Sequence, residues 1–246
     1  MNFNKKHILA LDIKAIDAFI FDADGTLVDT EAVGLDVVHA WALRLGISLS
    51  REAAHQQFRG VRMADVAVWL LAHASVEPPH LPALEQLYAQ IRDDMAEQFR
   101  AGVLPMPGAE ALLDVLAAQQ VPFCVATNGP PEKIDLTLAQ SGLASRFGAR
   151  VYSAYTVGHF KPAPGLFLHA AHALGVPAAR CVVVEDSLPG VEAAVAADMH
   201  VLVLLPMSAL PLYLQQHPQV WPIADLATVQ AWWLPSCSSP QCFITS

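Results

Sequence analysis

Five short runs of apolar and β-branched residues recur along the 246-residue chain, and segments with helical spacing alternate with the last four. The runs cover residues 18–21, 123–126, 151–152, 181–184 and 201–205. The helical segments cover residues 108–119, 131–141, 165–174 and 188–197. Strands that alternate with helices predict an α/β fold, here a doubly wound parallel sheet with a Rossmann-like core.

A long segment after the first run departs from this alternation. Between residues 31 and 102, apolar residues such as Val33, Val37 and Trp41 follow helical spacing, and no convincing strand occurs. We therefore expect a small all-helical domain inserted into the core. The predicted division is a core of residues 1–30 and 103–234, a helical domain of residues 31–102, and a flexible tail of residues 235–246.

The first apolar run ends in a pair of acids. Asp22 and Asp24 follow it directly, and Gly25 permits the sharp chain reversal of a catalytic loop. Two buried carboxylates this close would need a proton or a cation, and Mg²⁺ takes such hard oxygen ligands. One carboxylate could then attack phosphorus while the other moves a proton. The alternative is a surface turn after a strand, where Asp-x-Asp-Gly is also common.

Other polar residues follow the later runs. Thr127 and Glu185 each come just after a predicted strand, as Asp22 does. Because ligands of open parallel sheets bind beyond the carboxyl ends of the strands, these three side chains should lie at one edge. Thr127, with Asn128 and Gly129, precedes a predicted helix start that suits a phosphate. The alternative is that Thr127 or Asn128 merely caps that helix.

Two further motifs supply a cation and more acid. Lys161 stands before a proline, which keeps it out of the helix that follows, although a single lysine is commonly just solvated. Glu185 and Asp186 are adjacent carboxylates after the most β-like run. They could cap a helix favourably, or complete a hard-cation site with Asp22 and Asp24.

These motifs, in this order, resemble those of the haloacid dehalogenase superfamily of phosphohydrolases, over residues 16 to about 205. The resemblance implies a Mg²⁺-dependent phosphatase with Asp22 as nucleophile and Asp24 as acid and base. It also implies catalytic roles for Thr127 and Lys161. The implied metal ligands are Asp22, the backbone carbonyl of Asp24, Asp186 and Glu185. The helical insertion corresponds to the cap that closes over the site in this superfamily.

The substrate is expected to be chosen by the cap. Arg59 and Arg62 flank a glycine between two predicted cap helices. This loop, with residues 127–130, resembles a subgroup that hydrolyses 6-phosphogluconate, which implies substrate contacts from Arg59, Arg62, Asn128 and Gly129. A cation in this loop would suit the carboxylate of a sugar acid. Two solvated arginines are the alternative.

Two other functions compete with a phosphatase. A sugar phosphomutase of the β-phosphoglucomutase type shares all four motifs. Its cap carries a histidine where this chain has Gly34 and an arginine where this chain has Met63, and both departures weaken the mutase reading. A catalytically idle, metal- or partner-binding protein on the same fold is the second alternative.

The composition of the chain limits the kinds of partner that we expect it to bind. The net charge of −9 and the pI near 5.5 argue against a nucleic-acid partner, which requires a basic face. The most apolar run, residues 201–214, is too short to span a membrane and holds two prolines. We expect a cytoplasmic monomer or dimer that binds neither membrane nor nucleic acid and acts on small phosphate esters.

The cysteines and one histidine pair suggest no further metal site. Cys124 and Cys181 lie in predicted strands and should be buried. Cys237 and Cys242 lie in the tail, for which no role is predicted. His169 and His172 stand three residues apart without an evident third ligand, so we expect a structural role for them.

Overall fold

The computed structural model describes residues 15–59, 61, 63–76 and 81–233. Its centre is a six-stranded, fully parallel sheet in the order β3-β2-β1-β4-β5-β6. The strands are β1 (Ala18–Phe21), β2 (Phe123–Thr127), β3 (Val151–Ser153), β4 (Cys181–Glu185), β5 (His200–Val203) and β6 (Val220–Pro222). The predicted parallel α/β fold is confirmed, and β6 is a strand that the sequence pattern does not predict.

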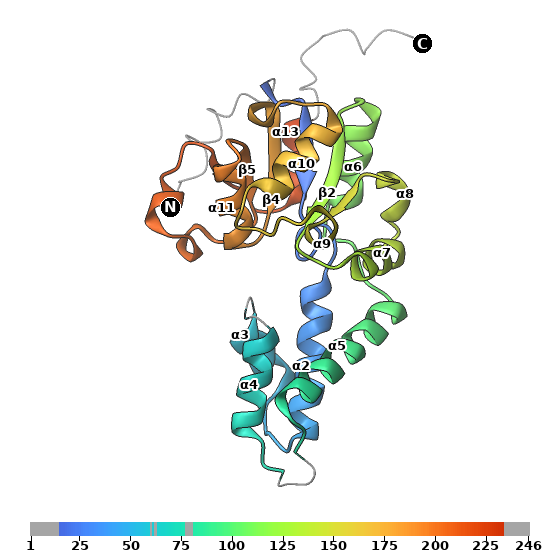
Figure 1. Cartoon of the computed structure of the whole chain (residues 1–246), viewed down its shortest axis with the longest axis vertical. Helices are drawn as coiled ribbons and strands as arrows, with labels where there is room; N and C mark the ends of the chain where they lie inside the picture. The colour runs from blue at the N-terminus through green and yellow to red at the C-terminus, as the bar shows by residue number, and fades with distance from the viewer. Residues whose placement is uncertain (1–14, 60, 62, 77–80, 234–246) are drawn as a thin grey trace, which may run out of the picture.

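Helices cover both faces of this sheet (Figure 1). The α-helices of the core are α6 (Ala109–Ala118), α7 (Pro131–Gln140), α8 (Ala144–Phe147), α9 (Ala154–Val157), α10 (Gly165–Leu174), α11 (Leu188–Ala196), α12 (Leu212–Gln215) and α13 (Leu226–Trp233). Alternate strand residues face opposite sides: Phe19 and Phe21 pack with α6, α7, α8 and α13, while Ile20 packs with α10, α11 and α12. The strands are buried on both faces, which explains their unbroken apolar character.

The segment between β1 and α6 is helical, as predicted. Its helices are α2 (Thr30–Arg44), α3 (Arg51–Phe58), α4 (Met63–His73) and α5 (Leu84–Ala101), and no strand occurs among its described residues. These helices share a separate apolar core that includes Val38, Leu70 and Ile91. Figure 1 shows them as a body at one end of the molecule, which α2 and α5 connect to the sheet. We call this body the helical insertion; the exact domain boundaries stay a prediction.

The loop after β1 is held rigidly at the carboxyl edge of the sheet. The backbone N–H of Asp22 donates to the carbonyl of Val184 on the neighbouring strand at 3.0 Å. Gly25 adopts φ +76°, and a Cβ at this position would lie 2.0 Å from Oδ2 of Asp186. Only glycine at position 25 therefore allows the loop after β1 and the side chain of Asp186 to approach each other this closely.

Two further features concern the cysteines and the helices that could cross a membrane. Cys124 and Cys181 are buried free thiols, as predicted, and burial raises the pKa of Cys124. Cys237 and Cys242 lie outside the described residues. Within the part of the chain that the structure describes, no helix combines the length and apolar character needed to cross a bilayer.

Candidate active site

A buried lysine joins two acids that are far apart in the sequence. Nζ of Lys161 lies 2.5 Å from Oδ1 of Asp22 and 2.8 Å from Oε2 of Glu185. The side chain of Lys161 is only 2% exposed, so these carboxylates take the place of water around its charge. Burial alone would lower the pKa of Lys161, but the two carboxylates raise it above its ordinary value.

Asn128 fixes the backbone from which Lys161 projects. Its Oδ1 accepts a hydrogen bond from the Lys161 N–H at 2.9 Å, and its Nδ2 donates to the Lys161 carbonyl at 3.2 Å. This pair of bonds ties the loop after β2 to the loop before α10. The predicted contact of Asn128 with a substrate stays a prediction.

Glu185 is fully satisfied within the protein. Its Oε2 binds Lys161, while its Oε1 accepts from the backbone N–H groups of Asp186 (3.1 Å) and Ser187 (3.0 Å). The hydroxyl of Ser187 adds a third bond to Oε1 at 2.7 Å. Glu185 is therefore placed to organise the site, while Asp186, whose Oδ1 accepts from Thr26 at 3.2 Å, is the more accessible acid.

The acids form a group that fits a divalent cation. Carboxylate oxygens of Asp22, Glu185 and Asp186 lie within 4.8 Å of one another, the one such group that could hold a metal among the described residues. Burial raises the pKa of Asp22 to about 7 despite the opposing effect of Lys161, and burial also raises the pKa of Asp186 well above its ordinary value. Three acids facing one ammonium leave excess negative charge, and hard oxygen donors are the ligands that Mg²⁺ prefers.

Asp24 is held at the mouth of this cluster by two donors. The hydroxyl of Thr30 binds its Oδ1 at 2.7 Å, and Nζ of Lys133 binds its Oδ2 at 2.7 Å. The Asp24 side chain is 31% exposed, whereas Asp22 is almost completely buried. The two acids of the first motif therefore have different surroundings, one suited to attack from a fixed position and the other to exchange protons.

Lys133 is a site residue that the sequence analysis missed. It lies in the first turn of α7, where the partial positive charge of the helix N-terminus repels a cation. That unfavourable position was the available signal, because a nearby acid such as Asp24 would offset it. Thr127, in contrast, is where the motif predicts, buried at the end of β2, with its Oγ1 accepting from the Gly129 N–H at 3.1 Å.

Gly129 brings the loop after β2 up to the acids. A Cβ on Gly129 would lie 3.6 Å from Oδ2 of Asp24 and 3.5 Å from Oγ1 of Thr127. The structure thus gathers the predicted Asp22, Asp24, Thr127, Lys161, Glu185, Asp186 and Gly129 at the carboxyl edge of the sheet. Their roles in catalysis and binding stay predictions.

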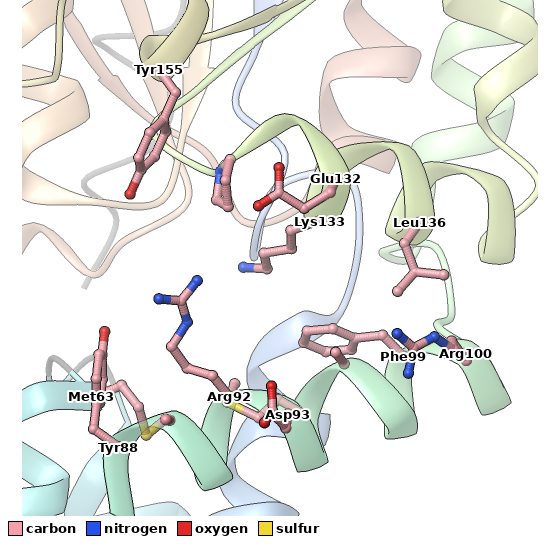
Figure 2. Close-up of a pocket in the computed structure, with 14 residues that line it drawn as sticks. Met63, Tyr88, Arg92, Asp93, Phe99, Arg100, Glu132, Lys133, Leu136 and Tyr155 are labelled. Atoms are coloured by element: carbon pink, nitrogen blue, oxygen red, sulfur yellow. The ribbon is translucent and has the colours of Figure 1, made fainter. Parts of the chain in front are cut away.

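A cleft of about 500 Å³ adjoins this cluster between the helical insertion and the core. Figure 2 shows α5 on one side of it and α7 on the other, with Lys133 reaching in from α7. The lining side chains include Met63, Tyr88, Arg92, Phe99, Lys133 and Tyr155. Lys133 also binds Asp24, so one lining residue of the cleft is in direct contact with the acidic site.

The two arginines that the sequence analysis singled out do not both have a described position. Arg62 lies outside the described residues. Arg59 is 67% exposed, pairs with Glu31 at 3.3 Å, and is not among the residues that line the cleft. A substrate contact from either arginine stays a prediction.

Comparison with known proteins gives one family over most of the chain. The model of the haloacid dehalogenase-like hydrolases matches residues 16–198. A solved structure of a family hydrolase from Deinococcus radiodurans R1, with bound phosphate and sodium, superimposes with a TM-score of 0.71. It is 28% identical and the match covers 90% of this chain and 98% of that one.

Curated relatives of similar length carry phosphatase names. A 6-phosphogluconate phosphatase of Escherichia coli (strain K12) is 29% identical over 216 residues, which cover 84% of this chain and 95% of that protein. A probable pseudouridine-5'-phosphatase of Drosophila melanogaster is 34% identical over 197 residues, which cover 78% of this chain and 83% of that protein. Both names describe hydrolases of phosphoric monoesters.

Proposed function

Because the chain belongs to the haloacid dehalogenase-like hydrolases, as its motifs predicted, we propose that it is a Mg²⁺-dependent phosphatase acting through an aspartyl-phosphate intermediate. The substrates are small phosphate monoesters, namely sugar or sugar-acid phosphates such as 6-phosphogluconate. One observation carries this proposal: a buried carboxylate, Asp22, is held by Lys161, while a second carboxylate, Asp24, is bound by Lys133, which lines a cleft of about 500 Å³. A cleft of this size suits a sugar phosphate.

The chain's own residues provide a nucleophile and a proton donor. Asp22 attacks phosphorus with one carboxylate oxygen, and the bond from phosphorus to the leaving oxygen breaks. Asp24 gives its proton to the leaving alkoxide and then removes a proton from the water that hydrolyses the intermediate. Lys161 holds Asp22 in place and, with the Thr127 hydroxyl and nearby backbone N–H groups, offsets negative charge on the transferring oxygens.

The acidic residues fit the ion that the family implies. Asp22, Asp186 and the backbone carbonyl of Asp24 would hold Mg²⁺, with Glu185 beside them. When bound, the ion supplies positive charge that balances the carboxylates and polarises the phosphoryl group. The raised pKa values of Asp22 and Asp186 support this assignment, since they reflect burial first and then repulsion from neighbouring carboxylates, which a bound cation would offset.

The residue at position 34 disfavours the mutase alternative. Gly34 is a buried residue of α2, and a Cβ there would lie 2.8 Å from Cε of Met95 on α5. This chain therefore lacks the histidine that the mutase carries at this position, and a side chain there would have to displace the end of Met95. The idle-protein alternative is disfavoured because every acid of the motifs is present and gathered at one site.

The remaining expectations concern the protein in the cell. A cytoplasmic location, a monomer or dimer, and the absence of nucleic-acid and membrane partners are proposed from the acidic composition and the nature of the site.

A turnover screen tests the proposed function. Purified protein is incubated with a panel of phosphate esters that includes 6-phosphogluconate and pseudouridine 5'-phosphate, with Mg²⁺ or with EDTA. Release of inorganic phosphate that requires Mg²⁺ is the expected result. Conversion of a sugar 1-phosphate into its 6-phosphate would favour the mutase, and no reaction with any ester would favour an idle protein.

A further inference from the structure

Two cationic side chains face the cleft from opposite walls. Arg92 comes from α5 in the helical insertion, and Lys133 comes from α7 in the core. Figure 2 shows the guanidinium of Arg92 reaching from α5 into the open space toward Lys133. Neither residue belongs to the sequence motifs that identify the family.

Arg92 differs from the other arginines around it. Arg44, Arg51, Arg59 and Arg100 of the helical insertion pair with Asp94, Asp36, Glu31 and Glu97. Among the described residues, no carboxylate oxygen lies within 4.0 Å of the Arg92 guanidinium, which instead lies over the ring of Tyr88 at 5.9 Å. Its charge is therefore available to something that enters the cleft.

The charge of Lys133 is already partly balanced by Asp24, at 2.7 Å. The acids Asp93 and Glu132 also line the cleft but form no ion pair with Arg92. Two cations that face one cavity raise its electrostatic potential and attract an anion. Because the guanidinium presents a planar set of donors, it suits a carboxylate or a phosphate.

We propose that Arg92, assisted by Lys133, binds a second anionic group of the substrate, at the end of the molecule remote from the phosphate that is hydrolysed. This inference rests on the proposed phosphatase function and narrows the substrate class to phosphate esters that carry a carboxylate or a second phosphate. Arg92 is then a specificity-determining residue supplied by α5, and the insertion and the core each contribute one cation to recognition.

The test compares two esters that differ at the remote end. 6-Phosphogluconate ends in a carboxylate, whereas glucitol 6-phosphate ends in a neutral alcohol. In Arg92→Gln, the ratio of kcat/KM for the acid to kcat/KM for the alcohol should fall about tenfold to a hundredfold, as expected for a lost charge-assisted hydrogen bond. Glucose 1,6-bisphosphate is a third arm, and a selective loss with it alone identifies the remote group as a phosphate.

Arg100→Gln is the matched control. Arg100 also lines the cleft from α5, but its guanidinium binds Glu97 at 2.9 Å. The ratio should stay within about twofold of the parent in this variant, because that charge is already engaged. An equal fall in both arginine variants would assign the effect to the general charge of the cleft and overturn the role of Arg92.

A binding measurement separates this inference from the proposed function. Calorimetry with 6-phosphogluconate is carried out on Asp22→Asn and on Asp22→Asn/Arg92→Gln. Binding that is at least tenfold weaker in the double variant supports the inference. Equal binding, or no binding to either protein, overturns it. If the parent enzyme hydrolyses none of the three esters, the proposed function fails. If it hydrolyses all three and Arg92→Gln leaves every ratio of kcat/KM unchanged, only the inference about Arg92 fails.

Discussion

Gly190 lies so close to Glu185 that a Cβ on the glycine would be 1.9 Å from the carboxylate carbon of the glutamate. Gly190 is the third residue of α11, and its N–H also donates to the Ser187 hydroxyl at 3.2 Å. The first turn of α11 therefore packs directly against the acid that holds Lys161. Gly190, which has no reactive side chain, therefore limits where the buried carboxylate of Glu185 can lie.

Gly190→Ala should displace Glu185 from Lys161. Although alanine favours helices more than glycine does, the overlap should cost about 1–3 kcal/mol of unfolding free energy and most of the turnover. Urea unfolding in EDTA measures the first and phosphate release the second. Gly34→Ala is the control: it is also a buried helical glycine, but its Cβ meets only the flexible end of Met95 at 2.8 Å. Its stability should change by less than about 1 kcal/mol, and equal losses in both variants would contradict the argument.

Asp22→Asn should abolish turnover and leave the fold intact. The amide keeps the shape of the side chain but is a very poor nucleophile, so phosphate release should fall at least about a thousandfold. Lys161 keeps its partner Glu185 in this variant, and the circular dichroism spectrum should be unchanged. Substantial Mg²⁺-dependent activity in the purified variant would exclude an aspartyl-phosphate on Asp22.

Asp24→Asn should impair poor leaving groups most. An alkyl phosphate releases a strongly basic alkoxide that needs a proton, whereas 4-nitrophenyl phosphate releases a stable phenolate. The loss of kcat/KM should therefore be about tenfold or more greater for the alkyl ester. The same factor for both esters would show that Asp24 is not the acid of the first step, and that its bonds to Thr30 and Lys133 serve only to order the site.

Mg²⁺ should stabilise the folded protein against heat. Asp22, Glu185 and Asp186 repel one another in the buried cluster, and a ligand that binds only the folded state raises Tm with its concentration. Differential scanning calorimetry with Mg²⁺ and with EDTA measures the shift. Asp186→Ala should lose the shift, while Arg100→Gln, whose guanidinium pairs with Glu97 and not with an acid of the cluster, should keep it. A shift that survives in Asp186→Ala would place the metal elsewhere.

The core of the site was predictable because a parallel sheet converts sequence order into position. Asp22, Thr127 and Glu185 each end an apolar run, and parallel pairing brings those ends to one edge. Their common position at this edge therefore follows from the pattern of strands and helices. The assignment of the family, over residues 16–198, rests on the same motifs.

Other features depend on contacts that local pattern does not encode. The bond from Lys133 to Asp24 joins residues 109 apart in the sequence, and Arg92 lies on a charged helix face like many solvated arginines. Strand β6 was missed because it has three residues and ends in Pro222, which suits only an edge strand. Arg59 stood out locally through its neighbouring glycine, but the fold pairs it with Glu31.

The central position of β1 in the sheet affects which parts of the molecule open most readily to solvent. This strand has a hydrogen-bonded neighbour on each side, and the amide of Asp22 is itself bonded to Val184. Amide hydrogens in such a strand exchange with solvent only through the largest opening events, whereas helices of a small peripheral body open at lower free energy. We therefore expect the proposed nucleophile Asp22 to follow the slowest-exchanging backbone, and Arg92 to lie in a part that opens more readily to admit a substrate while Asp22 stays in register.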